Sequence, residues 1–395
     1  MQRPVIAFGG LLILLFIVTA LSADAAEFIT SDGKVHQGEV EWRDNAFLVQ
    51  GQVVAPETMV EVRFNPPPQK TDATGTMLTL VDGSVQKARI TSSSLTKGLR
   101  IGGGTEVQSL VAGGVLSTNP EEHVPLSNIQ SISFNPVRGT TAPKIPPFKD
   151  GQVHIVRIDG TVATGEFSYI TSLLVGAKIN GKRERFRRNA LAAIHFRPPA
   201  APKGDGVLVR TTLGARILGG MDELTSDGLA VKTSLGEVKI AMKNLISIER
   251  VGSHITPLSE LQPATKKVMA FLDLVHPPQM NKDLFGFPLR AGAVTYDKGI
   301  AMHSRTELVF ETKGAALFVG MVGLDTRYSR VGTANLTISL DGKPVSNVEL
   351  AAGDPFQFIQ LPLGNSKRLG LVLDFGELGS AGDHALILNP RLVKN

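Results

Sequence analysis

The sequence predicts an all-β protein in which four tandem small β-barrel-like repeats precede a β-sandwich. Its 395 residues include 41 glycines and 23 prolines, a composition that favours turns and short strands over long helices. A hairpin turn with glycine recurs at Gly33, Gly83, Gly160 and Gly214. Seven short strand candidates follow one another between residues 307 and 392, a pattern typical of a sandwich.

Residues 1–26 have the pattern of a secretory signal peptide. Arg3 precedes an apolar run, Val5–Leu21, and the small residues of "SADAA" follow it, so we expect the mature protein to start near Glu27. The run is also long enough for an uncleaved membrane anchor, which is the alternative. The chain has no cysteine, so it has neither a lipid-anchored cysteine nor disulfides. This favours export in a bacterium, to the periplasm, the cell envelope or the extracellular space.

The four repeats are expected at residues 27–66, 76–136, 150–198 and 205–251. In the first three, an Asp-Gly pair joins two alternating strands, because glycine accepts a positive φ without steric cost. Each repeat ends in a short apolar strand, and a small bent sheet of this kind closes on itself to hide its edges. The layout is similar to Sm-like or SH3-like small barrels. Pro-rich joints between the repeats predict separate barrels on stiff spacers.

The last third of the chain carries several motifs in a fixed order. Tyr296–Thr312 contains the pattern Tyr-x-Lys-Gly-Ile-x-x-His-Ser, and an Asp-His pair stands at Asp383 and His384. The segments "VGLDTR", "LDGKPV", "AAGDP" and "RLGLVLDFG" lie between them. Together these motifs resemble the NPCBM family of carbohydrate-binding modules, over residues 265–395. The resemblance implies a galactose-binding-like jelly-roll β-sandwich that binds a glycan.

The candidate ligand-binding residues are His303, Arg327, Tyr328, Asp383 and His384. Imidazole, carboxylate and guanidinium groups hydrogen-bond sugar hydroxyls, and a tyrosine ring stacks on the apolar face of a sugar. The alternative is that the two histidines brace loops through backbone hydrogen bonds.

Aromatic residues are scarce near these candidates. In the family a tryptophan commonly follows the Asp-His pair, whereas this chain continues with Leu386, Ile387 and Leu388. Tyr296 is expected to be a core residue, because tyrosine is often mostly buried. We therefore expect any sugar affinity to be weak.

No enzymatic motif accompanies these residues. The sequence contains no His-Glu-x-x-His zinc motif and no Gly-x-Ser-x-Gly nucleophile elbow. The repeats occupy about the first 250 residues and leave no room for a large catalytic domain. The chain is therefore predicted to be non-catalytic and to need no cofactor. Whether a calcium ion sits in the sandwich is left open.

One basic cluster, Lys182–Arg188, lies in the third repeat. It is expected to be a solvated hairpin, since alternate residues of a strand share one face, with contact to an anionic envelope polymer as the alternative. Export argues against nucleic acid as a partner.

Two functions remain after these exclusions. In the first, the sandwich binds a glycan or a cell-envelope polysaccharide and the repeats are spacers or interaction modules. In the second, the chain is an envelope scaffold that binds other proteins and has lost its sugar site. An exposed aromatic ring beside His303 or His384 favours the first, whereas a closed apolar loop face favours the second.

Overall fold

The computed structural model describes residues 26–64, 76–95, 98–101, 123–138, 142–198, 206–212, 214–233, 236–269, 275–292, 294–328 and 330–394. These residues form the strands β1–β35 and five short 3-10 helices, η1–η5, so the all-β prediction is confirmed. The predicted signal peptide, except Ala26, lies outside the described residues. No helix within these ranges is long and apolar enough to cross a membrane.

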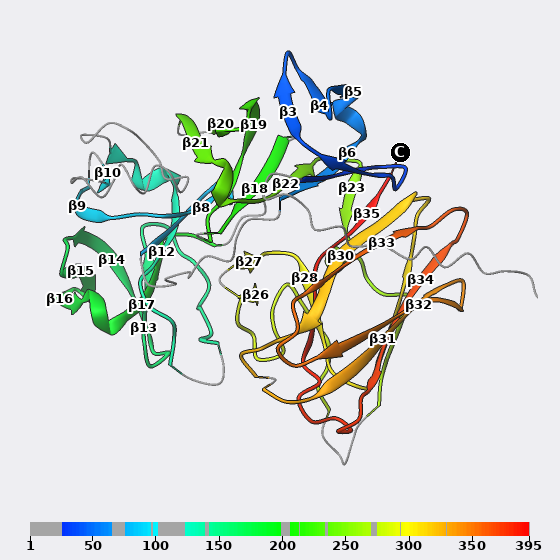
Figure 1. Cartoon of the computed structure of the whole chain (residues 1–395). Helices are drawn as coiled ribbons and strands as arrows, with labels where there is room; N and C mark the ends of the chain where they lie inside the picture. The colour runs from blue at the N-terminus through cyan, green and yellow to red at the C-terminus, as the bar shows by residue number, and fades with distance from the viewer. Residues whose placement is uncertain are drawn as a thin grey trace, which may run out of the picture.

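Four units of similar strand order make up the N-terminal part of the structure (Figure 1). Unit 1 (residues 26–64) contains β1 (Ala26–Thr30), β2 (Val35–Gly38), β3 (Val40–Arg43), β4 (Ala46–Val49), β5 (Gln52–Val54), η1 (Pro56–Thr58) and β6 (Met59–Arg63). Unit 2 (residues 76–134) contains β7 (Met77–Leu80), β8 (Val85–Lys87), β9 (Ile90–Ser94), β10 (Gly98–Ile101), β11 (His123–Val124), η2 (Leu126–Asn128) and β12 (Ile129–Ser133). In each of these units the first strand pairs with the last, as β1 with β6 and β7 with β12.

The other two units have fewer but longer strands. Unit 3 (residues 153–196) contains β13 (Val153–Arg157), β14 (Val162–Ile170), β15 (Leu174–Ile179), β16 (Lys182–Arg187), η3 (Arg188–Ala190) and β17 (Leu191–His195). Unit 4 (residues 206–251) contains β18 (Gly206–Thr211), β19 (Arg216–Leu224), β20 (Gly228–Thr233), β21 (Gly236–Ala241), η4 (Met242–Asn244) and β22 (Leu245–Val251). Again the first strand pairs with the last, as β13 with β17 and β18 with β22.

The first turn of each unit explains why the strand order recurs. Gly33, Gly83 and Gly160 have φ values of 82°, 91° and 85°, in the left-handed region that glycine tolerates. Asp82 Oδ1 accepts a hydrogen bond from the Ser84 amide at 2.8 Å, and the other Asp-Gly turns repeat this contact. The side chain thus stabilises the turn that local sequence predicts.

The units are not separate barrels, which differs from what the Pro-rich joints predict. β6 of unit 1 pairs with β22 of unit 4, and β12 of unit 2 pairs with β17 of unit 3. Within each pair of units a second contact joins β3 to β19 or β9 to β14. All four units share one hydrophobic core cluster. The closing strands are sheet edges, and pairing them with one another satisfies backbone groups that a lone unit leaves exposed.

The C-terminal region is a sandwich of two antiparallel sheets (Figure 1). Its elements are β23 (Ile255–Pro257), η5 (Leu258–Glu260), β24 (Thr265–Val268), β25 (Gln279–Met280), β26 (Leu289–Ala291), β27 (Val294–Tyr296), β28 (Gly299–Met302), β29 (Thr306–Glu311), β30 (Leu317–Leu324), β31 (Thr333–Leu340), β32 (Lys343–Ala351), β33 (Gln357–Pro362), β34 (Arg368–Phe375) and β35 (Ala385–Val393). One sheet has the order β25-β28-β35-β30-β33 and the other β24-β29-β34-β31-β32.

Each predicted strand of the sandwich corresponds to one of β29–β35. Side chains of both sheets, among them Phe310 and Phe318, form one buried cluster between the layers. β23 lies before the predicted start at residue 265 and pairs with β35, so the sandwich begins earlier than the motifs indicate.

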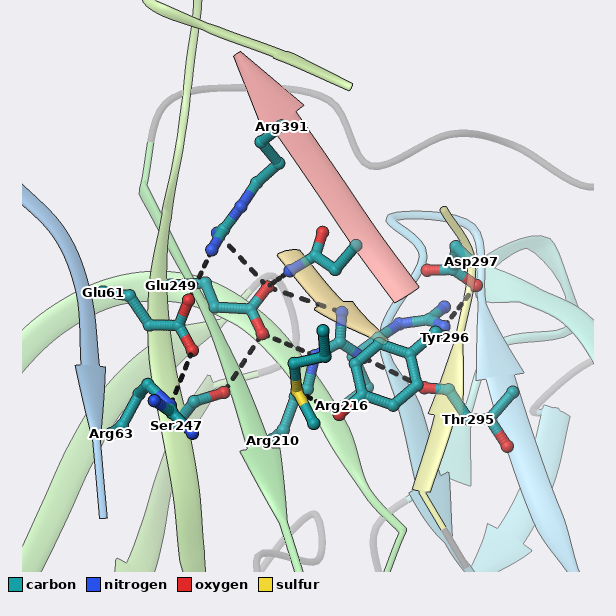
Figure 2. A network of polar contacts seen from close by, with 12 residues as sticks. Glu61, Arg63, Arg210, Arg216, Ser247, Glu249, Thr295, Tyr296, Asp297 and Arg391 are labelled. Atoms are coloured by element: carbon teal, nitrogen blue, oxygen red, sulfur yellow. Dashed lines mark hydrogen bonds and ion pairs between the residues drawn. The ribbon is translucent and has the colours of Figure 1, made fainter. Parts of the chain in front are cut away.

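The sandwich packs directly on units 1 and 4. An apolar cluster joins Ile29 and Val60 of unit 1 to Leu317, Val319 and Val393 of the sandwich. Beside it lies a buried network of charged residues in which β35 contributes Arg391 and the units contribute Glu61, Arg210 and Glu249 (Figure 2). The repeats are therefore part of one packed body with the sandwich rather than a flexible spacer.

Candidate functional site

The paired strands β28 and β35 bring the two motif histidines together at one end of the sandwich. Met302 is the register partner of Ala385, so His303, one residue after β28, lies next to His384, one residue before β35. Their ring centroids are 5.2 Å apart. Two motifs that are far apart in sequence therefore form one site, as the sequence predicts.

Three further rings surround this pair. His276 lies 4.5 Å from His303 and 6.2 Å from His384, measured between ring centroids. Phe285 and Tyr328 contact each other at a tilt of 49°, with ring centroids 4.3 Å apart, and their centroids lie 5.5 Å and 6.0 Å from that of His384. Phe285 and Tyr328 are half-buried, so part of each ring is open to solvent. Both residues are intermediate in exposure, so they meet the criterion of an exposed aromatic beside His384 only in part.

Sequence reasoning missed His276 and Phe285. Both lie in the irregular segment before β28, where no motif or spacing marks them. β25 pairs with β28 through Gln279 and Ala301, and this pairing carries His276 to His303. The only sequence signal was the nearness of the segment to the Tyr296 motif.

Asp383 and His303 act as braces behind the rings. Asp383 is fully buried, and His303 is 7% exposed. The Ser304 hydroxyl donates a hydrogen bond to Asp383 Oδ2, and His303 Nδ1 lies 2.8 Å from the Ser304 carbonyl oxygen. The His303 contact is the backbone bracing that the sequence leaves open as an alternative for the two histidines, and Asp383 adds a contact with the Ser304 side chain.

Arg327 is held by two acidic residues. Its Nε and Nη2 donate to Asp325 at 2.9 Å and 2.6 Å, and Nη2 also lies 3.0 Å from Asp283 Oδ2. Tyr328 donates its hydroxyl to the same Asp283 oxygen at 3.1 Å. Burial and the charge of Asp283 raise the pKa of Tyr328 to about 12, so the hydroxyl stays protonated. The network fixes the orientation of the Tyr328 ring.

Two polar atoms of the site lack partners. Asp383 Oδ1 and His384 Nδ1 are buried, and neither has a hydrogen-bond partner among the described residues. Such groups are uncommon in native proteins and call for a water or a ligand that satisfies them. Both atoms lie beneath the surface at this end of the sandwich, so a group that satisfies them has to reach below the rings.

Burial shifts the pKa values of Asp383 and His384 in the directions that favour the neutral form of each side chain. Desolvation raises the pKa of Asp383 from 3.8 to about 6, although the Ser304 hydrogen bond lowers it. Desolvation, together with the charges of His303 and His276, lowers the pKa of His384 from 6.5 to about 4. Near pH 7 His384 is therefore neutral, so one ring nitrogen accepts and the other donates.

These shifts predict opposite pH dependences for two variants. The folded state holds the Asp383 proton more tightly than the unfolded state. The contribution of Asp383 to the stability of the protein therefore falls as the pH rises from about 4 to 6. His384 binds its proton less tightly in the folded state. The contribution of His384 to the stability of the protein therefore falls as the pH falls from 6.5 toward 4. Between pH 4 and 6 we expect the thermal midpoint of Asp383→Asn to rise with pH more steeply than that of the wild type. The midpoint of His384→Gln should rise less steeply, and three parallel curves would contradict the assignment.

Within the described ranges, no group of three or more His, Asp or Glu side chains is arranged to hold a metal ion. The acidic residues nearest the rings, Asp283 and Asp325, are already paired with Arg327.

Comparison with known proteins relates the sandwich to a domain family. Residues 255–393 match the family model of the NPCBM/NEW2 domain. No curated protein matched the sequence. Among solved structures, the chain is similar to CBM51 from Clostridium perfringens GH95 in complex with methyl-galactose, with 22% identity and a TM-score of 0.32 over 35% of this chain and 99% of that one. It is also similar to the tandem CBM51 modules of Sp3GH98 from Streptococcus pneumoniae SP3-BS71, with 11% identity and a TM-score of 0.32 over 93% and 88% of the two chains. Both TM-scores are low, so the assignment of residues 255–393 rests on the family match.

Proposed function

Since residues 255–393 match the NPCBM/NEW2 domain, we propose that the chain is an exported, non-catalytic carbohydrate-binding protein. The sugar contacts the end of the sandwich formed by His276, Phe285, Tyr328 and His384, which we call the ring face. The observation that carries the proposal is the pair of half-buried rings, Phe285 and Tyr328, beside the unpartnered His384 Nδ1. An aromatic face with a few polar atoms is the usual way in which proteins combine stacking and hydrogen bonding.

The carboxylates near the ring face support a binding role rather than hydrolysis. A glycosidase needs two carboxyl groups that flank the scissile bond. Asp283 and Asp325 are held in ion pairs with Arg327, and Asp383 is fully buried behind the rings. The alternative of a protein scaffold with a lost sugar site predicts a closed apolar face, and the exposed parts of Phe285 and Tyr328 favour sugar binding instead.

Substitutions at the ring face are expected to weaken glycan binding without unfolding the chain. A glycan array probed with the full mature chain identifies the ligand, and titration calorimetry then compares variants. We expect Tyr328→Ala to weaken binding about tenfold, because a stacking ring and its buried area are lost. Tyr328→Phe keeps the ring and should lose less, although its contact with Asp283 disappears.

The matched control is Val345→Ala. Val345 is exposed and follows the Asp341–Gly342 turn, at the opposite end of the sandwich from the ring face. The control should bind as the wild type does. If Tyr328→Ala and Phe285→Ala both bind glycan unchanged, the ring face is not the site.

Export is the second part of the proposal. The N-terminal pattern supports cleavage near Glu27, and β1 begins at Ala26 with Phe28 and Ile29 fully buried. A cut beyond Phe28 therefore removes core residues, so cleavage is expected near Glu27 and not beyond Phe28. Intact-mass measurement on envelope fractions checks this. A full-length mass in the membrane pellet indicates the uncleaved anchor instead.

A further inference from the structure

A cavity of about 890 Å³ opens between units 2 and 3. Both units contribute to it: Arg89, Ile90 and Phe134 come from unit 2, and Leu173, Arg187 and Arg188 come from unit 3 and its turns. Of the described residues that line the cavity, three are arginines and none is acidic. A volume of this size is in the range of natural ligand sites, and its charge is of one sign.

Arg188 turns inward from the end of the basic strand β16. The Arg188 guanidinium donates to the carbonyl oxygens of Ile90 and Thr171 at 3.0 Å and 3.2 Å and to the Thr76 hydroxyl at 2.7 Å. Its carbon Cζ lies 5.0 Å from the Phe134 ring centroid. Its contacts with described residues are neutral oxygens and a ring, and desolvation lowers its pKa. Because no acidic side chain among the described residues pairs with the half-buried Arg188 guanidinium, an anion that enters the cavity is stabilised by it.

The other pair of units shows that the fold does not require this charge. Arg188 begins η3 and its amide donates to the Leu173 carbonyl, whereas Met242 begins η4 and its amide donates to the Asp227 carbonyl. Met242 of unit 4 thus corresponds to Arg188 of unit 3, and Asp227 of unit 4 corresponds to Leu173 of unit 3.

The two remaining arginines have matched positions as well. Arg187 ends β16 as Ala241 ends β21, and the hairpin registers match Arg89 of unit 2 with Glu39 of unit 1. Three cations in one pair of units therefore stand where the other pair has one methionine, one alanine and one glutamate. The positive charge is specific to the cavity between units 2 and 3.

We propose that this cavity binds an acidic glycan segment, with Arg188 and Arg187 facing its carboxylate or sulfate groups and Phe134 and Leu173 contacting the apolar faces of its sugar rings. Arginine recognises both anions through paired hydrogen bonds. The choice of a sugar as the body that carries the anion rests on the proposed function of the same chain. The cavity is then a second site, which binds an anion and is separate from the ring face.

The test uses the full mature chain and three variants. Titration calorimetry compares oligogalacturonate, a sulfated oligosaccharide, neutral maltohexaose and oligoglutamate at one fixed ionic strength. Arg188→Met copies the residue of unit 4. Leu173→Glu places an acid at a side chain that is 74% exposed and therefore tolerates replacement. Arg183→Gln is the matched control, because it removes one exposed charge of β16 outside the cavity.

We expect Arg188→Met and Leu173→Glu each to weaken binding of an acidic oligosaccharide about tenfold, as the loss of a charge-assisted hydrogen bond implies, and Arg183→Gln to change it much less. Tighter binding of oligogalacturonate indicates that the cavity recognises carboxylate groups, whereas tighter binding of the sulfated oligosaccharide indicates sulfate groups. If Arg188→Met does not fold, Leu173→Glu decides. Equal loss in Arg183→Gln, tighter binding of oligoglutamate, or no binding of either acidic oligosaccharide overturns the proposal.

The experiment tests the cavity and the ring face separately. Acidic-probe binding that survives His384→Ala supports a site in the units apart from the ring face, whereas its loss in His384→Ala overturns that separation. Failure of neutral glycans to bind the wild type, with acidic binding intact, counts against the ring face alone.

Discussion

Glu249→Gln is expected to lower the free energy of unfolding of the full chain by about 3–5 kcal/mol, because it leaves the buried Arg210 without its paired carboxylate and removes one of the two acids near Arg391. Glu249 accepts hydrogen bonds from Arg210 Nε at 2.6 Å, Ser247 Oγ at 3.0 Å and Asn389 Nδ2 at 2.7 Å (Figure 2). Arg391 Nη1 lies 3.7 Å from Glu249 Oε2. Glutamine keeps the shape but not the charge.

The pKa of Glu249 reports the same balance. Burial raises the pKa of a carboxyl group, yet the charges of Arg210 and Arg391 outweigh burial and hold the pKa of Glu249 below its ordinary value. Glu61 has weaker compensation, and burial raises its pKa despite Arg391. Glu249 is therefore the ionised centre of the network, and its loss affects more contacts than that of Glu61.

Chemical unfolding of purified protein measures the effect. The matched control is Asp222→Asn, which breaks the exposed pair with Lys232 and should cost at most about 1 kcal/mol. Because Asn389 and Arg391 belong to the sandwich, Glu249→Gln should also increase protease cleavage between unit 4 and β23. If the variant and the control are equally stable, the network does not hold the two parts together.

Tyr296→Ala is expected to destabilise the chain by a similar amount, about 3–5 kcal/mol, because it leaves a large cavity in a packed interface. Tyr296 belongs to the motif that resembles the carbohydrate-binding family, yet it is only 4% exposed and faces units 1 and 4 rather than the ring face (Figure 2). The Arg210 guanidinium lies 4.3 Å from its ring centroid, a cation–π contact that a desolvated site strengthens. The expectation that Tyr296 is a core residue is thus confirmed.

Tyr296→Phe separates the ring from its hydroxyl. The hydroxyl contacts only Met321 Sδ, at 3.6 Å, among its described hydrogen-bond partners, so the phenylalanine variant should lose much less stability than the alanine variant. Burial raises the pKa of Tyr296 from 10.0 to about 12, so its contribution to stability stays constant below about pH 10 and falls as the pH rises from 10 to 12. Thermal unfolding distinguishes the variants, and a Tyr296→Phe loss as large as that of Tyr296→Ala contradicts the packing argument. Glycan binding at the ring face should be unchanged in Tyr296→Phe.

Both predictions bear on whether the sandwich stands alone. The strand pattern predicts that residues from about 265 onward fold by themselves. In the structure, however, removal of units 1 and 4 exposes Leu317, Val319 and Val393 and leaves Arg391 without Glu61 and Glu249. A truncated sandwich is therefore expected to be less stable than the same residues in the full chain.

The sequence by itself determined the all-β fold, the strands β29–β35 and the motif residues that meet at the ring face. These features follow from local physics: an Asp-Gly turn needs a positive φ wherever it occurs, and alternating apolar residues mark a strand without knowledge of its neighbours. His303 and His384 were found differently, through the ordered motifs that resemble the NPCBM family rather than through a strand pattern.

Tertiary structure alone decided the rest. The pairing of β6 with β22 and of β12 with β17, the placing of His276 and Phe285 beside His384, and the arginines of the cavity between units 2 and 3 depend on segments far apart in the chain. Arg391 looks like any strand residue in the sequence, and only docking against Glu61 and Glu249 buries it. The strength of a charged contact depends on its distance and desolvation, and both are set by the docking of whole sheets rather than by any local pattern.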